Sequence, residues 1–263
     1  MWKTGITKVE PNHLVTRGYK QEDLIGNVSF SNVVFLLLKG KLPNESEGKM
    51  LDAILTSSID HGATPPTTLA SRIVASAGVP LPTAVAAGIL AVGDVHGGAI
   101  ENSARLLQEW APKDKPEKAA KELLEFLKFK GKRMPGVGHR IHTCDPRTQK
   151  LFTLANELKI ADKHIALMKA IETEINRTSR SGGDKGLKKP LPINVDGAIA
   201  AIVSDMGFDW KLGKAFFLLG RVAGLVAQVY EEQTREKPMR PICTVDAEYD
   251  GPWERDLPKD KKK

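Results

Sequence analysis

The chain has few cysteines, few aromatic residues and no long apolar run, and each shortage argues against a class of protein. Its 263 residues include only two cysteines, Cys144 and Cys243, which are far apart and form no C-x-x-C pair. Neither a disulfide framework nor a thiolate metal site is indicated, and a reducing, cytoplasmic compartment is expected. Because no basic and apolar leader opens the chain and no run of about 18 apolar residues occurs, we expect neither export nor a membrane span.

The composition favours helices and leaves the kind of ligand open. Aromatic residues make up only 6% of the chain, whereas Ala, Leu, Ile and Lys recur throughout, which is typical of a helical fold. The formal net charge of +7 would suit nucleic acid, a small polyanionic substrate or a phosphorylated cofactor. The cations are not interleaved with aromatic residues as in a base-stacking groove, so no nucleic acid partner is expected.

Apolar periodicity and helix-capping signals predict an almost wholly helical chain. The first twenty residues are expected to be extended, and an apolar helix through residues 33–38 should begin at a Ser29 cap. Asp145 is a suitable cap for another helix, with Pro146 in its first turn. The further helices are expected at about 46–58, 67–77, 82–92, 99–110, 115–129, 146–158, 162–177, 194–205 and 211–232.

Residues 135–147, Pro-Gly-Val-Gly-His-Arg-Ile-His-Thr-Cys-Asp-Pro-Arg, form a segment that no ordinary core element would use. Gly136 and Gly138 permit positive φ angles and a close approach to a ligand, which would expose backbone donors. His139 can transfer a proton near neutral pH, and Arg147 offers a planar fork that matches a carboxylate. The alternative is a Gly/Pro turn with solvent-facing cations.

Arg221 lies in the helix A-F-F-L-L-G-R-V-A-G-L-V-A, which is apolar on nearly every side. No acid stands three or four residues away, so the guanidinium has no partner on its own helix. An unpaired buried charge would be strongly unfavourable. Either a carboxylate from another element meets Arg221, or a ligand supplies the carboxylate.

Asp196 and two histidines occupy breaks where chemistry is possible. Asp196 stands at the start of an apolar helix, where an ordinary N-cap would also stand. His96 precedes Gly97 at a helix entrance, where a neutral imidazole could donate a hydrogen bond, although a satisfied loop histidine is the alternative. His61 stands in an Asp-His-Gly break and is uninformative alone.

Together these residues resemble the citrate synthase superfamily in order, spacing and local context, over nearly the whole chain. The segments that carry the resemblance are Arg17-Gly18-Tyr19, Ser29 to Pro43, Asp60-His61, His96-Gly97-Gly98-Ala99, Pro-Gly-x-Gly-His with Asp145-Pro146-Arg147, Asn194-Val195-Asp196, Gly220-Arg221, Arg240-Pro241 and Tyr249-x-Gly251-Pro252. The resemblance implies an all-α fold with a large helical domain (1–98 and 208–263), a small CoA-binding domain (99–207) and an active site in the cleft between them.

The resemblance also implies a role for each candidate residue. His96 and Asp196 would flank the acetyl group of a CoA thioester, and His139 would face the oxygen on the carbon that is attacked or cleaved. The substrate-binding residues would be His61, Arg147 and Arg221 of one subunit, with Arg240 from the neighbouring subunit of a homodimer. Gly136, Val137 and Gly138 would recognise coenzyme A through their backbone. No metal and no permanently bound cofactor is implied, because coenzyme A is part of the substrate.

Three features separate this chain from the usual synthase pattern. It is much shorter, its aspartate motif reads Asn-Val-Asp-Gly-Ala, and its His139–Arg147 interval is one residue shorter. These features resemble stand-alone citryl-CoA lyase and the homologous module of ATP-citrate lyase. The expected reaction is cleavage of citryl-CoA to acetyl-CoA and oxaloacetate, as in a reductive tricarboxylic acid cycle. Citrate or methylcitrate synthase is the first alternative, and a non-catalytic CoA-binding subunit is the second.

Overall fold

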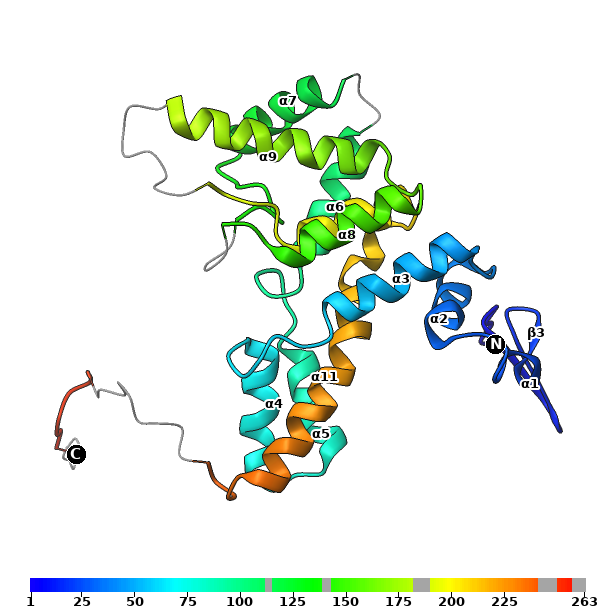
Figure 1. Cartoon of the computed structure of the whole chain (residues 1–263). Helices are drawn as coiled ribbons and strands as arrows, with labels where there is room; N and C mark the ends of the chain where they lie inside the picture. Colours follow the sequence, from blue (N-terminus) through cyan, green and yellow to red (C-terminus); the bar gives the residue numbers. More distant parts are fainter. Residues whose placement is uncertain (112–114, 139–142, 182–189, 241–249, 257–263) are drawn as a thin grey trace, which may run out of the picture.

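In the computed structural model, which describes residues 1–111, 115–138, 143–181, 190–240 and 250–256, the chain begins with a small antiparallel sheet (Figure 1). Its strands are β1 (Thr7–Glu10), β2 (His13–Thr16) and β3 (Tyr19–Lys20), in the order β1-β2-β3. Thr7 pairs with Thr16, and Thr16 pairs with Tyr19 across the second turn. The prediction that the first twenty residues are extended is therefore confirmed.

The rest of the described chain is helical, which confirms the all-α prediction. After the short α1 (Gln21–Leu24), Ser29 caps α2 (Phe30–Lys39) by accepting a hydrogen bond from the Asn32 N–H, as predicted. Asn44 and Glu47 form a capping box at the start of α3 (Glu45–Ser57). The remaining helices are α4 (Pro66–Ser76), α5 (Leu81–Leu90), α6 (Ala99–Trp110), α7 (Pro116–Phe129), α8 (Pro146–Glu157), α9 (Lys163–Ser181), α10 (Val195–Asp205), the 3-10 turn η1 (Trp210–Leu212) and α11 (Gly213–Arg235).

The helices gather around two apolar clusters. The larger one surrounds α10, whose residues 198–203 are wholly buried, with α6 and α9 packed against it and α2 and α3 contributing from the N-terminal side. The smaller one joins α4 and α5 to the second half of α11 through Ala75, Ala84, Val85, Leu225 and Val229. Figure 1 shows α6–α9 together at one end of α11 and α4 and α5 beside its other end. The predicted domain boundaries at 98/99 and 207/208 stay a prediction.

Segment Trp210–Arg235, which contains α11, is long and apolar enough to cross a membrane by length and composition. That is weak evidence, because the core helix of a soluble protein meets the same test. Gly224 allows very close packing here, since a Cβ atom built on it would lie 2.0 Å from the Ile59 carbonyl oxygen. Helix α11 is therefore a packed core helix that also holds the Ser58–Asp60 segment.

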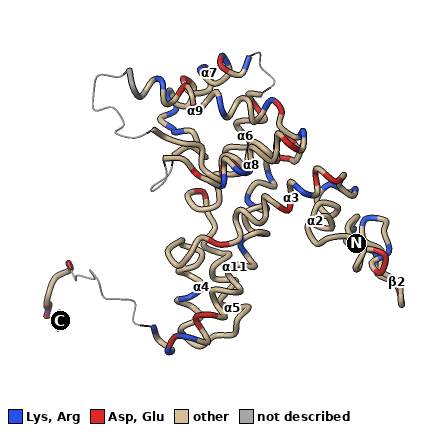
Figure 2. The backbone as a smooth tube through the Cα atoms, viewed as in Figure 1, with Lys and Arg blue, Asp and Glu red and all other residues tan. Residues whose placement is uncertain are grey.

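Charges of both signs are spread over the described helices. Figure 2 shows Lys and Arg scattered among Asp and Glu over the described chain, with long stretches that carry neither.

Candidate active site

Arg221 is buried in the middle of α11, as its sequence context predicts, with a side chain only 4% exposed. Its Nε donates to the Ser58 carbonyl at 2.9 Å, Nη1 lies 3.4 Å from Thr67 Oγ1, and the guanidinium stacks 4.7 Å from the centre of the Phe217 ring. Among the described residues no carboxylate forms an ion pair with it. Burial accordingly lowers the pKa of Arg221. The nearby carboxylates of Asp60 and Asp196 oppose this shift, and a carboxylate supplied by a ligand stays a prediction.

His96 lies beside Arg221 in the loop that leads into α6. Its Nε2 is 3.1 Å from Thr67 Oγ1, and its ring meets Phe217 edge-on at 5.4 Å. Thr67 is wholly buried and accepts from Arg221. Among the described residues, His96 Nε2 is the one acceptor with which its hydroxyl proton can form a hydrogen bond. This arrangement assigns the proton of neutral His96 to Nδ1, which leaves an N–H donor for a ligand oxygen.

Burial lowers the pKa of His96, and the nearby charges of Arg221 and His61 lower it further. Although a neutral His96 was expected from a helix N-terminus, the larger causes are therefore burial and cationic neighbours. His61 is more exposed, but its pKa is lowered by partial burial and by the charges of Arg147 and Arg221. Both imidazoles are thus held neutral near physiological pH.

Asp196 lies in the first turn of α10, and the interpretation of this residue as the helix cap is wrong. Asn194 is the N-cap and accepts from the Gly197 N–H at 3.1 Å. Among the described residues the Asp196 carboxyl has no hydrogen-bond partner. Burial raises its pKa to about 6, against the opposing charges of Arg147 and Arg221. A carboxyl group with a pKa near neutrality can both give and take a proton.

Residues 136–138, called the glycine loop below, contact the start of α10 next to Asp196, where Gly136 packs against Gly197. Gly136 and Gly138 have φ angles of +80° and +104°, as their sequence context predicts. A Cβ atom on Gly197 would lie 2.3 Å from the Gly136 carbonyl oxygen, so only glycine fits there. Val137 forms a β-bridge with Ile193, and Asn194 Nδ2 donates to the Gly138 carbonyl at 2.9 Å.

The expectation that this loop exposes its backbone donors is wrong for Gly138. Its N–H donates to the Pro192 carbonyl at 2.7 Å, and the Gly136 carbonyl accepts from the Asn194 N–H at 3.1 Å. These groups join the loop to the start of α10 and are therefore not free to bind a ligand. Any recognition of coenzyme A by Gly136, Val137 and Gly138 must therefore use the groups that remain.

Asp145 and Arg147 form the third support of the site. Asp145 caps α8 as predicted, and its wholly buried carboxylate holds the Arg147 guanidinium in a bidentate pair at 2.9 and 3.1 Å. It also accepts from the Val195 N–H at 3.2 Å, which joins α8 to α10. Burial alone would raise the pKa of Asp145, but the hydrogen bonds and charge of Arg147 outweigh it and lower the pKa. The Arg147 side chain stays 26% exposed, so part of its fork remains available.

Five of the predicted residues therefore come from different elements into one electrostatic environment. The pKa values of His61, His96, Asp196 and Arg221 each respond to the charge of at least one other member of this group or of Arg147. His139 lies outside the described residues. Arg240 lies beyond the far end of α11, where it pairs with Glu232 and Glu236 of its own chain. Its action in a neighbouring subunit stays a prediction.

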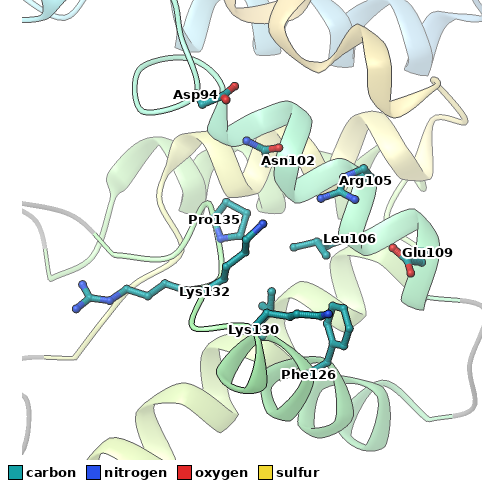
Figure 3. A pocket seen from close by; sticks show the side chains of 11 residues that line it. Asp94, Asn102, Arg105, Leu106, Glu109, Phe126, Lys130, Lys132 and Pro135 are labelled. Carbon is teal, nitrogen blue, oxygen red and sulfur yellow. The ribbon is translucent and has the colours of Figure 1, made fainter.

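A cationic cavity of about 660 Å³ lies between α6 and α7, next to the glycine loop (Figure 3). Arg105, Lys130, Lys132 and Arg133 supply four positive charges, against the two carboxylates of Asp94 and Glu109. Leu106 and Phe126 supply apolar wall. Sequence reasoning missed this cluster, as it missed Thr67. The signal was present in the run Lys-Phe-Lys-Gly-Lys-Arg at 128–133, which places four cations in six residues before the glycine loop. Such a cavity suits phosphate groups attached to an apolar or aromatic body.

Two neutral histidines, a carboxyl group with a raised pKa and two arginines thus meet at one place in an all-α fold. Such a set of groups suits acid–base chemistry beside carboxylates. A model of the family "Citrate synthase, C-terminal domain" matches residues 44–242. The chain belongs to the citrate synthase family.

Solved structures confirm the expected citrate synthase-like fold. The citryl-CoA lyase from Hydrogenobacter thermophilus is 46% identical, with a TM-score of 0.88 and 98% of each chain covered. The ATP citrate lyase from Methanothrix soehngenii, in complex with citrate and coenzyme A, is 22% identical with a TM-score of 0.80, over 96% of this chain and 42% of that one.

Among curated proteins, ATP-citrate synthase beta chain protein 1 from Oryza sativa subsp. japonica is 26% identical over 259 residues. The match covers 92% of this chain and 38% of the rice protein. The chain thus spans about two-fifths of the length of this relative.

Proposed function

We propose that the protein is a citryl-CoA lyase, which cleaves citryl-CoA to acetyl-CoA and oxaloacetate. The observation that carries the proposal is the 46% identity, over 98% of both chains, to the citryl-CoA lyase from Hydrogenobacter thermophilus. The geometry around Asp196, His96 and Arg221 supports it, because a carboxyl group with a raised pKa, a neutral imidazole and a buried guanidinium suit carbon–carbon cleavage of such a substrate.

The cleavage requires two proton movements and one transient negative charge. The hydroxyl proton of the citryl group leaves to a base, for which His139 is the candidate, and the carbon–carbon bond breaks as that oxygen becomes the ketone of oxaloacetate. The electron pair moves into the enolate of acetyl-CoA. His96 donates its Nδ1–H to the enolate oxygen, and Asp196 gives its proton to the enolate carbon, which forms the methyl group.

The charge states suit these roles. A neutral His96 stabilises the developing oxyanion without losing its own proton, which agrees with the lowering of its pKa by burial and by Arg221. Asp196, with its pKa raised to about 6, carries a transferable proton in a useful fraction of molecules near neutral pH. Returning that proton to the carboxylate from the methyl group would run the same step backwards.

The carboxylates of the oxaloacetate portion are assigned to Arg221 and Arg147. Arg221 is a buried guanidinium with no carboxylate partner among the described residues, so a substrate carboxylate would complete its pairing. Arg147 is held in place by Asp145 and keeps an exposed edge. His61 lies within the electrostatic range of both arginines and is assigned to the same part of the substrate.

Coenzyme A is proposed to enter as part of the substrate, along the glycine loop. The cationic cavity of Arg105, Lys130, Lys132 and Arg133 would hold its phosphates, with Phe126 beside the adenine (Figure 3). The ATP citrate lyase from Methanothrix soehngenii, which shares the fold, is a complex with citrate and coenzyme A. Homodimerisation, with Arg240 serving the neighbouring site, is part of the same proposal.

Two reaction mixtures test the proposal against citrate synthase and against a non-catalytic CoA-binding subunit. The purified protein is offered either citryl-CoA or acetyl-CoA with oxaloacetate, while oxaloacetate and free thiol are followed. A lyase forms oxaloacetate and acetyl-CoA from the first mixture and releases little free thiol from either. Thiol release from both mixtures would identify a synthase, and coenzyme A binding without reaction would identify the scaffold.

A further inference from the structure

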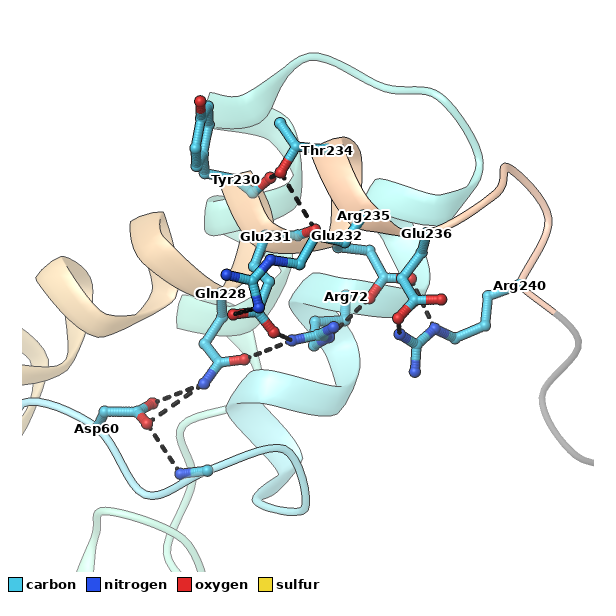
Figure 4. A network of polar contacts seen from close by, with 11 residues as sticks. Asp60, Arg72, Gln228, Tyr230, Glu231, Glu232, Thr234, Arg235, Glu236 and Arg240 are labelled. Atoms are coloured by element: carbon cyan, nitrogen blue, oxygen red, sulfur yellow. Dashed lines mark hydrogen bonds and ion pairs between the residues drawn. The ribbon is translucent and has the colours of Figure 1, made fainter.

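The C-terminal end of α11 contains a carboxylate that is shared by two arginines (Figure 4). The Glu232 side chain is 1% exposed. One of its oxygens accepts from Arg72 Nε of α4 at 2.6 Å, and the other accepts from Arg240 Nε at 2.7 Å. Each arginine thus takes one oxygen of a single buried charge, and removing that charge would affect both.

Arg240 is held in place by further contacts besides its hydrogen bond with Glu232. Its Nη2 lies 2.7 Å from Glu236 Oε1, on the exposed side. The preceding residue, Met239, has a φ of +53°, and its N–H donates to the Ser76 carbonyl at the end of α4. The backbone and two carboxylates therefore fix Arg240 after the helix has ended. The side chain is 36% exposed, so its fork keeps an outward edge.

The other end of the same network reaches the candidate active site. Arg72 Nη1 donates to Gln228 Oε1 at 2.7 Å, and Gln228 Nε2 donates to the Asp60 carboxylate at 3.2 Å. Asp60 also accepts from the Gly62 N–H at 2.9 Å, and this bond closes the turn around His61. A continuous polar chain therefore runs from the His61 turn to Arg240 (Figure 4).

We infer that Glu232 is a positioning residue for Arg240, holding its guanidinium at the place from which it binds a substrate carboxylate. The inference rests on the proposed function, in which Arg240 binds the substrate in the neighbouring subunit. Arg72 and Gln228 connect Glu232 to the turn around His61 in the same chain. The end of α11 thereby aligns one residue of its own site and one residue of the neighbouring site.

The test is a double-mutant cycle between Glu232→Gln and Arg240→Ala, with citryl-CoA as substrate. If Glu232 acts through Arg240, Glu232→Gln alone raises KM with a smaller effect on kcat and lowers kcat/KM about 10- to 100-fold. The same change in the Arg240→Ala background then lowers kcat/KM by less than about twofold. The dissociation constant for free coenzyme A should stay unchanged in every variant.

Two further variants separate positioning from folding. Glu231→Gln is the matched control, because Glu231 lies on the same helix and contacts Arg72 and Arg235 but not Arg240. Its kcat/KM should stay within about twofold of the wild type. Glu236→Gln removes the exposed ion pair between Arg240 and Glu236 and leaves the buried pair with Glu232 intact. We expect a KM increase of about two- to fivefold that disappears in the Arg240→Ala background.

The outcomes are distinguishable. A wild-type protein that does not cleave citryl-CoA overturns the proposed function. If the wild type cleaves citryl-CoA, effects of Glu232→Gln and Arg240→Ala that multiply independently show a merely structural Glu232 and overturn the inference. Should Glu232→Gln fail to fold, the Glu236→Gln cycle decides. If Glu236→Gln does not raise KM, or raises it equally in the Arg240→Ala background, the carboxylates do not position Arg240 and the inference is wrong.

Discussion

Replacing Asp196 by Asn should make the protein more stable and the enzyme much slower. Burial raises the pKa of this carboxyl from its usual 3.8 to about 6. A folded-state pKa above the unfolded one means that ionised Asp196 destabilises the fold. This penalty is absent below the usual pKa and complete above about 6. The difference between the two values corresponds to about 3 kcal/mol at pH 7.

An uncharged Asn removes this penalty but leaves an amide in a partly buried place, so the net gain in unfolding free energy should be about 1–3 kcal/mol at pH 7. That gain corresponds to a rise in Tm of about 3–9 °C for a chain of this size. It should fade as the pH is lowered to 4. The loss of the transferable proton should meanwhile lower kcat by about two to four powers of ten.

The assay is urea and thermal unfolding at pH 7 and pH 4, together with single-turnover cleavage of citryl-CoA. Asp52→Asn is the matched control, since Asp52 is exposed on α3 and should change neither stability nor turnover. An Asp196→Asn protein that is no more stable than the wild type at pH 7, or that gains more at pH 4, would refute the electrostatic reasoning. Turnover close to that of the wild type would remove Asp196 from the chemistry.

Three other substitutions test the supports of the site. Asp145→Asn breaks the buried pair with Arg147 and should lower the unfolding free energy at pH 7 by about 3–5 kcal/mol. Because the pKa of Asp145 is lowered in the folded protein, urea titrations should show a smaller loss as the pH falls below 3.8, the usual pKa of an aspartate. Thr67→Val removes the hydroxyl donor that fixes the His96 tautomer and should lower kcat about tenfold in steady-state assays, whereas Thr67→Ser should retain most of the rate. Gly197→Ala places a methyl group 2.3 Å from the Gly136 carbonyl; calorimetry should show a destabilisation of about 1–3 kcal/mol, and an unchanged Tm would contradict the close packing.

The helices could be predicted from local signals because capping residues mark their ends in the sequence. Ser29 and Asp145 cap α2 and α8 as their positions predict, and the expected boundaries differ from the observed ones by only a few residues. The main departures are at α9, which extends to Ser181, and at the turn η1 that precedes α11. Helix α9 ends in Thr-Ser-Arg-Ser, which contains no apolar residue, and η1 is a three-residue turn capped by Asp209. Helix ends of this kind are hard to place from sequence alone.

The site could be predicted only where a residue contradicts its surroundings. Arg221 was conspicuous because an apolar helix gives a charge no partner, and the structure shows it buried among Ser58, Thr67 and Phe217. Asp196 was ambiguous, because a carboxylate at a helix start suits capping as well as chemistry. The structure separates the two readings by giving the cap to Asn194.

Other parts of the site depend on contacts between distant segments and left no local signal. Thr67 is one hydroxyl in the Pro-Pro-Thr-Thr segment at the start of α4, and only the fold brings it between His96 and Arg221. The pairing of Glu232 with Arg72 joins residues 160 positions apart. Such long-range pairs follow from the packing of α4 against α11, which no short window of sequence specifies.

A citryl-CoA lyase breaks the carbon–carbon bond of citryl-CoA and leaves the thioester intact. The most direct measurement is a single turnover of citryl-CoA in ¹⁸O-labelled water, with mass spectrometry of all CoA species and acids. The account predicts acetyl-CoA and oxaloacetate in equal amounts, with no free coenzyme A beyond the protein-free control. Free coenzyme A together with citrate that carries ¹⁸O in one carboxyl group would show thioester hydrolysis and contradict the account.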